Sequence, residues 1–212
     1  MDTTVPAATR PGYVDAAIAI GRGRGLAAGL EAALEGLDPV TVAPSCYVAL
    51  TETAVPAPNG PFTLIPHRLA EHEGIRFVRL HGQCPQTHAG LPPERAVTLA
   101  AVRLGVLYAM LDAAIVFLSD RTAGGVSLID KQLVMGTIAD TVAEAGLLRE
   151  ALTLAFTDPA AIVGPCNEQL SALGWQVAAL FGASGYLEDH PVRALYVSEL
   201  VAGAWSEVSA PC

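Results

Sequence analysis

The feature that most restricts how this chain can fold is a long apolar stripe between residues 91 and 118. Pro92 and Pro93 precede it, where the start of a helix favours proline. A spacing of three or four residues puts the stripe on one face of an α-helix, roughly 40 Å long at about 1.5 Å per residue. Its members are Val97, Ala101, Leu104, Tyr108, Leu111, Ile115 and Leu118. Partner helices must cover a stripe of this length.

Three more helical segments follow. Ser127 and Asp130 have the spacing of a capping box, and a second stripe then runs until Asp158-Pro159 stops it. We expect a third helix from about residue 166 to 181, and a fourth from about 191 to 205. Four antiparallel helices with short connections form an up-and-down bundle. The predicted fold class is therefore mainly α.

A small α+β segment is predicted in front of this bundle. Residues 14–37 look broadly helical, although their glycines would weaken the helix. Residues 40–53 are predicted to be extended, and FTLIP and IRFVRL are candidates for a second strand pair. We expect a reduced N-terminal segment over residues 1–90 and a four-helix domain over residues 91–212.

The composition favours a globular cytoplasmic protein. Apolar residues make up 52% of the chain, and the net charge of −9, without a basic cluster, argues against a nucleic-acid partner. The N-terminus lacks the basic start and apolar run of a signal peptide. The longest apolar stretch, residues 96–118, contains Arg103 and Asp112, so a packed bundle helix explains it better than a membrane span.

Neither the cysteines nor the histidines have the spacing of a metal site, and we expect no metal. The cysteines lie far apart and are predicted to be reduced thiols: Cys46, Cys84, Cys166 and Cys212. The histidines share one 22-residue window with Glu71 and Glu73, but match no helix-face pair: His67, His72, His81 and His88.

The segment IAIGRGRGL, residues 18–26, has some features of a phosphate-binding loop. Its glycines stand at 21, 23 and 25, and Leu26 occupies the place that Gly-x-Gly-x-x-Gly requires for its third glycine. The acidic residue expected about 20 residues later is also missing. A glycine-broken helix or a turn fits better.

Glu94 is a candidate for acid–base chemistry, and a histidine is the alternative for proton transfer in an enzyme without a cofactor. An acid in the first turn is stabilised by the helix dipole, which is enough to explain its presence. If this helix end faces a pocket, however, the same carboxylate could act as a general base.

Two connecting segments contain glycines that a turn alone would explain. Residues 121–132, RTAGGVSLIDKQ, and residues 180–191, LFGASGYLEDHP, contain glycines that permit tight turns or the close approach of a ligand. In the first segment, Arg121 and Gln132 have no role in a turn.

Together these segments resemble the C-terminal helical domain of the acyl-CoA dehydrogenase family. That family has a long helix ending in Arg-x-x-Phe-Gly and a Gln eleven residues after the Arg, leading into a helix with Leu-Ala-Asp. Arg121, Gly125, Gln132 and the run 138–140 occur at matching spacing, with Gly124 in place of the Phe. GASGYLEDHPVRALY is similar to the family's glycine turn and final helix. The resemblance covers about residues 91–207.

The resemblance implies FAD as a cofactor, at a boundary between subunits. Arg121 and Gln132 would contact the flavin pyrophosphate and adenosine of a neighbouring subunit, and Gly182 and Gly185 would allow close backbone approach. An arginine also suits a diphosphate physically. The implied assembly is a homodimer or tetramer, or a hetero-oligomer with a family member. About 90 residues precede the bundle, so the β region that helps to enclose FAD is reduced.

The resemblance also bears on the catalytic base. Most family members supply a glutamate after the last helix, where this chain has Ser206, with Glu207 one residue late. Isovaleryl and long-chain members use a glutamate at the start of the first helix instead, in a context that LPPERAV resembles. Glu94 would then remove the α-proton of an acyl thioester while the flavin accepts a hydride.

Three functions remain open at this point. The chain could be an acyl-CoA dehydrogenase-like enzyme that acts on an acyl thioester or a polyketide-like substrate. It could be a non-catalytic subunit that completes the FAD site of a full-length partner. It could also be a cofactor-free cyclase or isomerase on the same scaffold, because a fold does not fix the chemistry.

Overall fold

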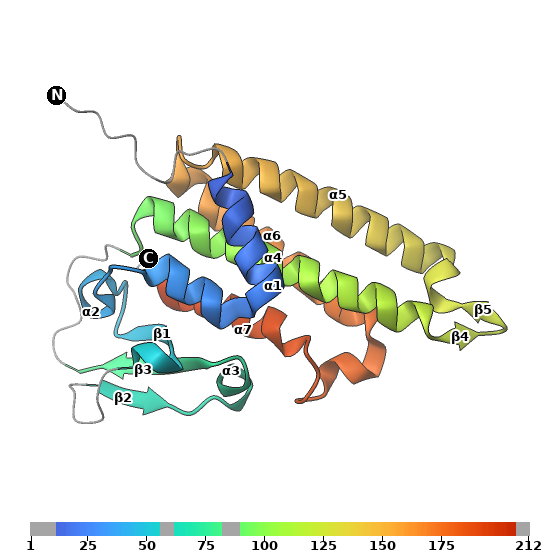
Figure 1. Ribbon diagram of the computed structural model, residues 1–212, viewed down its shortest axis with the longest axis horizontal. Coiled ribbons are helices and arrows are strands. Elements are labelled where there is room, and N and C mark those ends of the chain that lie inside the picture. Colours follow the sequence, from blue (N-terminus) through green and yellow to red (C-terminus); the bar gives the residue numbers. More distant parts are fainter. Residues whose placement is uncertain (1–11, 56–61, 82–89, 207–212) are drawn as a thin grey trace, which may run out of the picture.

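Long helices dominate the computed structural model, which describes residues 12–55, 62–81 and 90–206 (Figure 1). Four of them form a bundle: α4 (Pro93–Ser119), α5 (Gln132–Leu154), α6 (Pro159–Leu180) and α7 (Arg193–Trp205). Helix α4 packs against the other three. The predicted mainly α fold with a four-helix bundle is confirmed.

A helix and a small sheet precede the bundle. They comprise α1 (Tyr13–Leu34), α2 (Pro39–Val42), β1 (Tyr47–Thr51), η2 (Glu52–Ala54), β2 (Phe62–Ile65), α3 (Arg68–His72) and β3 (Ile75–Leu80). The strands form an antiparallel sheet in the order β1-β3-β2, with Ala49 and Leu64 opposite Phe77 and Val78. The strands predicted at FTLIP and IRFVRL are confirmed.

The extended segment predicted at residues 40–53 is right only for β1. Residues 39–42 instead form a short helix, because Asp38 caps its start and accepts a hydrogen bond from the Val40 N–H at 3.1 Å. Pro39 stands at the first helical position, which favours the same outcome.

Helix α1 crosses α4 so closely that only glycines fit at the contact. A Cβ added to Gly21 would lie 2.1 Å from the Val102 carbonyl oxygen, and one on Gly105 would lie 2.1 Å from the Ile18 carbonyl oxygen. A Cβ on Gly29 would lie 2.1 Å from a methyl carbon of the Val102 side chain. Helix α1 also kinks at Gly25, whose φ is 81°. The glycines of IAIGRGRGL therefore belong to a glycine-broken helix, as expected.

Two helix boundaries differ from the prediction. The Ser127 hydroxyl donates to the Ser119 carbonyl at the end of α4, and Lys131, without a side-chain cap, precedes α5. The predicted capping box is therefore wrong. Asp158 accepts from the Ala161 N–H at 3.3 Å and caps α6, so Asp158-Pro159 begins a helix well before residue 166.

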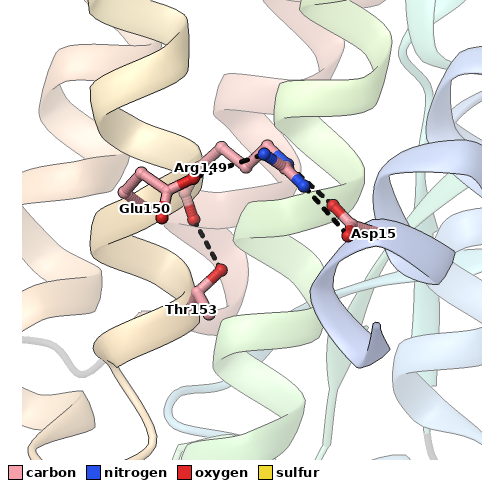
Figure 2. A network of polar contacts seen from close by, with 4 residues as sticks. All are labelled: Asp15, Arg149, Glu150 and Thr153. Carbon is pink, nitrogen blue, oxygen red and sulfur yellow. Dashed lines mark hydrogen bonds and ion pairs between the residues drawn. The ribbon is translucent and has the colours of Figure 1, made fainter. Parts of the chain in front are cut away.

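Ion pairs hold α1 to the bundle from its exposed side. Figure 2 shows Arg149 of α5 in a two-pronged contact with Asp15 of α1, at 2.7 Å and 3.0 Å. The guanidinium lowers the pKa of the Asp15 carboxyl. Because the two side chains are 45% and 54% exposed, solvent screens the pair, which fixes the position of α1 more than it stabilises the fold. Arg22 makes a similar contact with Asp112 of α4.

The core runs without a break from the sheet into the bundle. Residues 97–107 of α4 are all buried, because α1, α6 and α7 cover different faces of this helix. The indole N–H of Trp205 donates to the Ala49 carbonyl of β1 at 2.9 Å, which ties the last helix to the sheet. The domain boundary expected at residue 90 stays a prediction.

Helix α4 is long and apolar enough to cross a membrane, but 56% of its most apolar window is buried inside the protein. Such burial is typical of a core helix.

The cysteines differ from the expectation of four reduced thiols. Cys46 is disulfide-bonded, which corrects that expectation, and Cys166 is free and buried. Burial raises the pKa of the Cys166 thiol. Cys84 and Cys212 lie outside the described residues.

The glycine contact predicts a difference between two neighbouring substitutions. We expect Gly21→Ala to lower the free energy of unfolding by about 1–3 kcal/mol, since its Cβ meets backbone that must shift. Gly23→Ala is the control: its Cβ meets nothing within 4 Å, so the better helix former should be neutral or stabilising. Urea unfolding measures both, and equal effects would contradict a close crossing.

Candidate functional site

The predicted site residues lie at opposite ends of α4. Glu94 stands in its first turn, and Arg121 lies two residues after its last residue, Ser119. The helix has 27 residues and is therefore roughly 40 Å long at about 1.5 Å per residue. Figure 1 shows the small β4–β5 hairpin at the end of α4 that is far from the three-stranded sheet. The structure does not bring Glu94 and Arg121 together.

A two-strand hairpin carries the chain from α4 toward α5. Strands β4 (Thr122–Ala123) and β5 (Val126–Ser127) pair antiparallel, and Gly124 and Gly125 form the turn with φ values of 64° and 77°. Two consecutive positive φ values are what a tight hairpin turn of this kind needs. A hydrogen bond of 2.7 Å from the Leu128 N–H to the Arg121 carbonyl closes the hairpin base. This bond brings Arg121 near the start of α5.

Arg121 is exposed and held over an aromatic ring. Its guanidinium carbon lies 3.5 Å from the centre of the Phe117 ring, and Nη1 donates to the Phe117 carbonyl at 3.2 Å. Among the described residues no carboxylate forms an ion pair with it. Phe117 therefore orients a guanidinium that keeps donors for an external anion.

Gln132 is exposed at the first residue of α5. The start of this 23-residue helix has no side-chain cap, so N–H groups of its first turn are available to an anion. A guanidinium and the N–H groups of a helix start can bind a diphosphate, and an amide side chain can hydrogen-bond to an adenosine, which are two parts of FAD. Contact of Arg121 and Gln132 with a cofactor stays a prediction.

The glycine turn η4 (Gly182–Tyr186) lies beside this end. Phe181, just before it, has its ring centre 5.1 Å from that of Phe117 and 4.6 Å from that of His190. Burial and the nearby Arg193 charge lower the pKa of His190. Gly182 has a φ of 56°, while a Cβ on Gly185 would lie 2.9 Å from the Ala178 carbonyl oxygen. The turn thus has its own conformational and packing reasons for glycine, and its role in cofactor approach stays a prediction.

A cavity of about 380 Å³ lies at the other end of α4, between the starts of α4 and α6 and the end of α7. Its wall is mostly apolar and includes Leu91, Ala96, Leu99, Val163, Ala202 and Trp205. Ser206 also lines it and donates to the Ala202 carbonyl at 2.8 Å. Glu94 is exposed on the adjoining turn and is not part of the wall.

Sequence reasoning missed Arg103, which lies 2% exposed in the middle of α4. Its guanidinium donates to neutral oxygens, including the Asn167 side chain at 2.6 Å and the Ser171 hydroxyl at 3.0 Å. Burial lowers its pKa to about 10, and the charge of Glu199 opposes this shift. Removing one of these acceptors would leave part of a buried charge without a hydrogen bond, which typically costs about 1–3 kcal/mol or more. A cation within an uninterrupted apolar run was the available signal.

A smaller cavity, of about 230 Å³, lies between α6, η4 and α7. Trp175, Tyr186 and Tyr196 line it, and so does Gly185. None of the other predicted site residues reaches it.

The histidines that fall within the described residues have separate partners. His67 caps α3, His72 lies 3.8 Å from a Glu188 oxygen, and His81 contacts Thr63 at 2.7 Å. His88 lies outside the described part of the chain. Among residues 12–55, 62–81 and 90–206, no group of three or more His, Cys, Asp or Glu could hold a metal ion.

Comparison with known proteins gives one family match. Residues 85–205 match the family profile described as acyl-CoA dehydrogenase, C-terminal domain. No curated protein matches the chain.

Solved structures give the same fold. Butyryl-CoA dehydrogenase from Megasphaera elsdenii is 17% identical with a TM-score of 0.54, over 71% of this chain and 46% of that one. The ChsE4-ChsE5 complex from Mycobacterium tuberculosis is 19% identical with a TM-score of 0.51, over 70% and 46%. The Tcur3481-Tcur3483 steroid ACAD is 19% identical with a TM-score of 0.51, over 78% and 52%. The chain spans about half the length of these structures, and the likeness is one of fold.

Proposed function

Because the chain belongs to the acyl-CoA dehydrogenase family, we propose that it is a subunit that completes the FAD site of a second, full-length family member. The observation that carries this proposal is the position of Arg121 and Gln132. Both are exposed at the hairpin end of α4 and α5, at the far end of α4 from the cavity beside Glu94. Arg121 and Gln132 are too far from the cavity of their own chain to contact a ligand there, but they are free to contact a cofactor bound by another chain.

The surface of α5 supports a partner at this end. Only four of its 23 residues are buried, and Figure 1 shows it on the outer side of the bundle. Leu133, Leu147 and Leu154 are 87%, 71% and 63% exposed. They are spaced by multiples of seven residues and so lie close to one helix face. An exposed apolar face that begins beside Gln132 is typical of a protein interface.

Two of the similar structures are of paired proteins, ChsE4-ChsE5 and Tcur3481-Tcur3483. This pairing supports a family member as the partner, and a second copy of this chain is the alternative. Bound FAD would supply the hydride acceptor in the complex. The residues of this chain would bind and orient: Arg121 would hold the diphosphate, Phe117 would fix its guanidinium, and Gln132 would contact the adenosine.

A substitution at Arg121 tests this role in the complex. The chain is co-expressed with full-length acyl-CoA dehydrogenases of the same genome, and the FAD content of the purified complex is measured by flavin absorbance. We expect Arg121→Ala to weaken FAD binding by about tenfold or more, because a charge-assisted hydrogen bond to phosphate is lost.

Arg24→Ala is the matched control, since Arg24 is an exposed arginine of α1, away from the hairpin. Equal FAD content in the Arg121→Ala and Arg24→Ala complexes would contradict the role of Arg121. If no full-length family member or second copy forms a stable complex with the chain, the proposal fails.

A second candidate function is the α,β-oxidation of an acyl thioester by this chain itself, with Glu94 as the base. The cavity favours it, because Pro93 and Ala96 line its wall on the same turn of α4 as Glu94. The carboxylate would need to turn toward a bound thioester to take its α-proton. A cofactor-free cyclase or isomerase would use the same cavity and would remain active without any flavin.

The Glu94 role predicts a loss of activity without a loss of fold. We expect Glu94→Gln to lower the rate of acyl-CoA oxidation in a flavin-loaded preparation by about 100-fold or more, because the general base is removed. The thermal unfolding midpoint should barely change, since the side chain is exposed. The control is Glu168→Gln, at an exposed position of α6. Full activity in Glu94→Gln across butyryl-CoA to palmitoyl-CoA would exclude Glu94 as the base.

A further inference from the structure

The buried guanidinium of Arg103 stands directly behind the wall of the larger cavity. Leu99, one helical turn before it on α4, lines the cavity, and so does its hydrogen-bond partner Asn167 on α6. Ser171 and Ser198 accept the other hydrogen bonds, at 3.0 Å and 3.5 Å. No carboxylate forms an ion pair with Arg103 among the described residues, so its charge is not neutralised by direct contact.

Arg103 fixes the orientation of the Asn167 side chain. A guanidinium only donates, so the Asn167 atom that lies 2.6 Å from Nη1 must be the amide oxygen. The Asn167 backbone carbonyl accepts from the same nitrogen at 3.3 Å, which holds the residue from two sides. The NH₂ group of Asn167 is therefore left as a hydrogen-bond donor, polarised by the cation that binds its oxygen.

This amide is the one side-chain donor without a partner on the described wall. The Trp205 indole N–H donates to the Ala49 carbonyl, and the Ser206 hydroxyl donates to the Ala202 carbonyl. Apolar side chains make up most of the remaining wall, and no acidic side chain belongs to it. A mostly apolar cavity with one donor backed by a positive charge suits an apolar molecule that ends in an anionic oxygen.

We propose that the cavity binds an aliphatic carboxylate, whose oxygen accepts from the Asn167 amide while Arg103 holds that amide in place. The carboxylate could belong to a free fatty acid or to the far end of a dicarboxylic acyl thioester, since both present the same group. This site lies at the opposite end of α4 from Arg121 and is independent of the proposed role in FAD binding.

Trp205 gives a local readout of binding, because it lines the cavity and the chain has only one other tryptophan, Trp175. In a Trp175→Phe background, the indole fluorescence reports Trp205 alone. Octanoate, octanol and octylamine share a chain and differ in their head group. We expect saturable binding of octanoate, about tenfold weaker binding of octanol and no binding of octylamine. Equal binding of octanoate and octanol, or no response to octanoate, would overturn the proposal.

Two substitutions at Asn167 test the donor itself. Asn167→Leu removes the amide and should weaken octanoate binding by about tenfold while leaving octanol unchanged. Asn167→Asp keeps an acceptor for Arg103, so it should preserve the fold, but its charge should abolish octanoate binding. Gln176→Leu, on an exposed position of the same helix, is the control. Unchanged octanoate affinity in a folded Asn167→Asp protein would overturn the proposal.

Competition between thioesters identifies the source of the carboxylate. Displacement of octanoate by suberyl-CoA but not by octanoyl-CoA would assign the site to a dicarboxylic acyl thioester. Displacement by neither would assign it to a free fatty acid. Equal displacement by both thioesters would show that the cavity does not select for a carboxylate, and would contradict the proposal.

Discussion

The close backbone contact between α1 and α4 is the interaction on which the rest of the structure depends. Gly21 and Gly105 let the two helices approach until a Cβ on either would clash with the other backbone. With α1 on one side and α6 and α7 on others, residues 97–107 of α4 are buried all round. The middle of α4 is therefore held on all sides, and its exposed residues lie in its first turn and in its C-terminal third.

Each end of α4 has a different chemistry. The first end adjoins a mostly apolar cavity that is also lined by the start of α6 and the end of α7. Asn167 belongs to the wall of this cavity and accepts a hydrogen bond from the buried Arg103. The second end carries a glycine hairpin that presents Arg121 on the ring of Phe117, beside the start of α5. Because a rigid helix of roughly 40 Å separates them, one small ligand cannot engage both. We therefore propose two separate sites, one for a small ligand in the cavity and one for the cofactor of a partner protein at the hairpin.

Local patterns in the sequence predicted the bundle, two strands and the family, because periodicity and the spacing of Arg121 and Gln132 are properties of one segment. The profile match over residues 85–205 confirms that resemblance. Contacts between distant segments could not be predicted in this way. Gly21 packs against Val102, which lies more than 80 residues further along the chain. The Ser127 hydroxyl donates to the end of α4 and does not cap α5, and Cys46 is disulfide-bonded. Arg103 was visible as a charge in an apolar run, but its partners Asn167 and Ser198 belong to other helices.

The central claim is that this chain supplies part of a cofactor site to a second protein. Native mass spectrometry of the co-expressed complex and of the full-length partner alone tests it most directly, because it weighs the chains and the bound FAD together. The account predicts that FAD is retained by the complex and is lost more readily from the partner alone. Equal retention of FAD with and without this chain would contradict it.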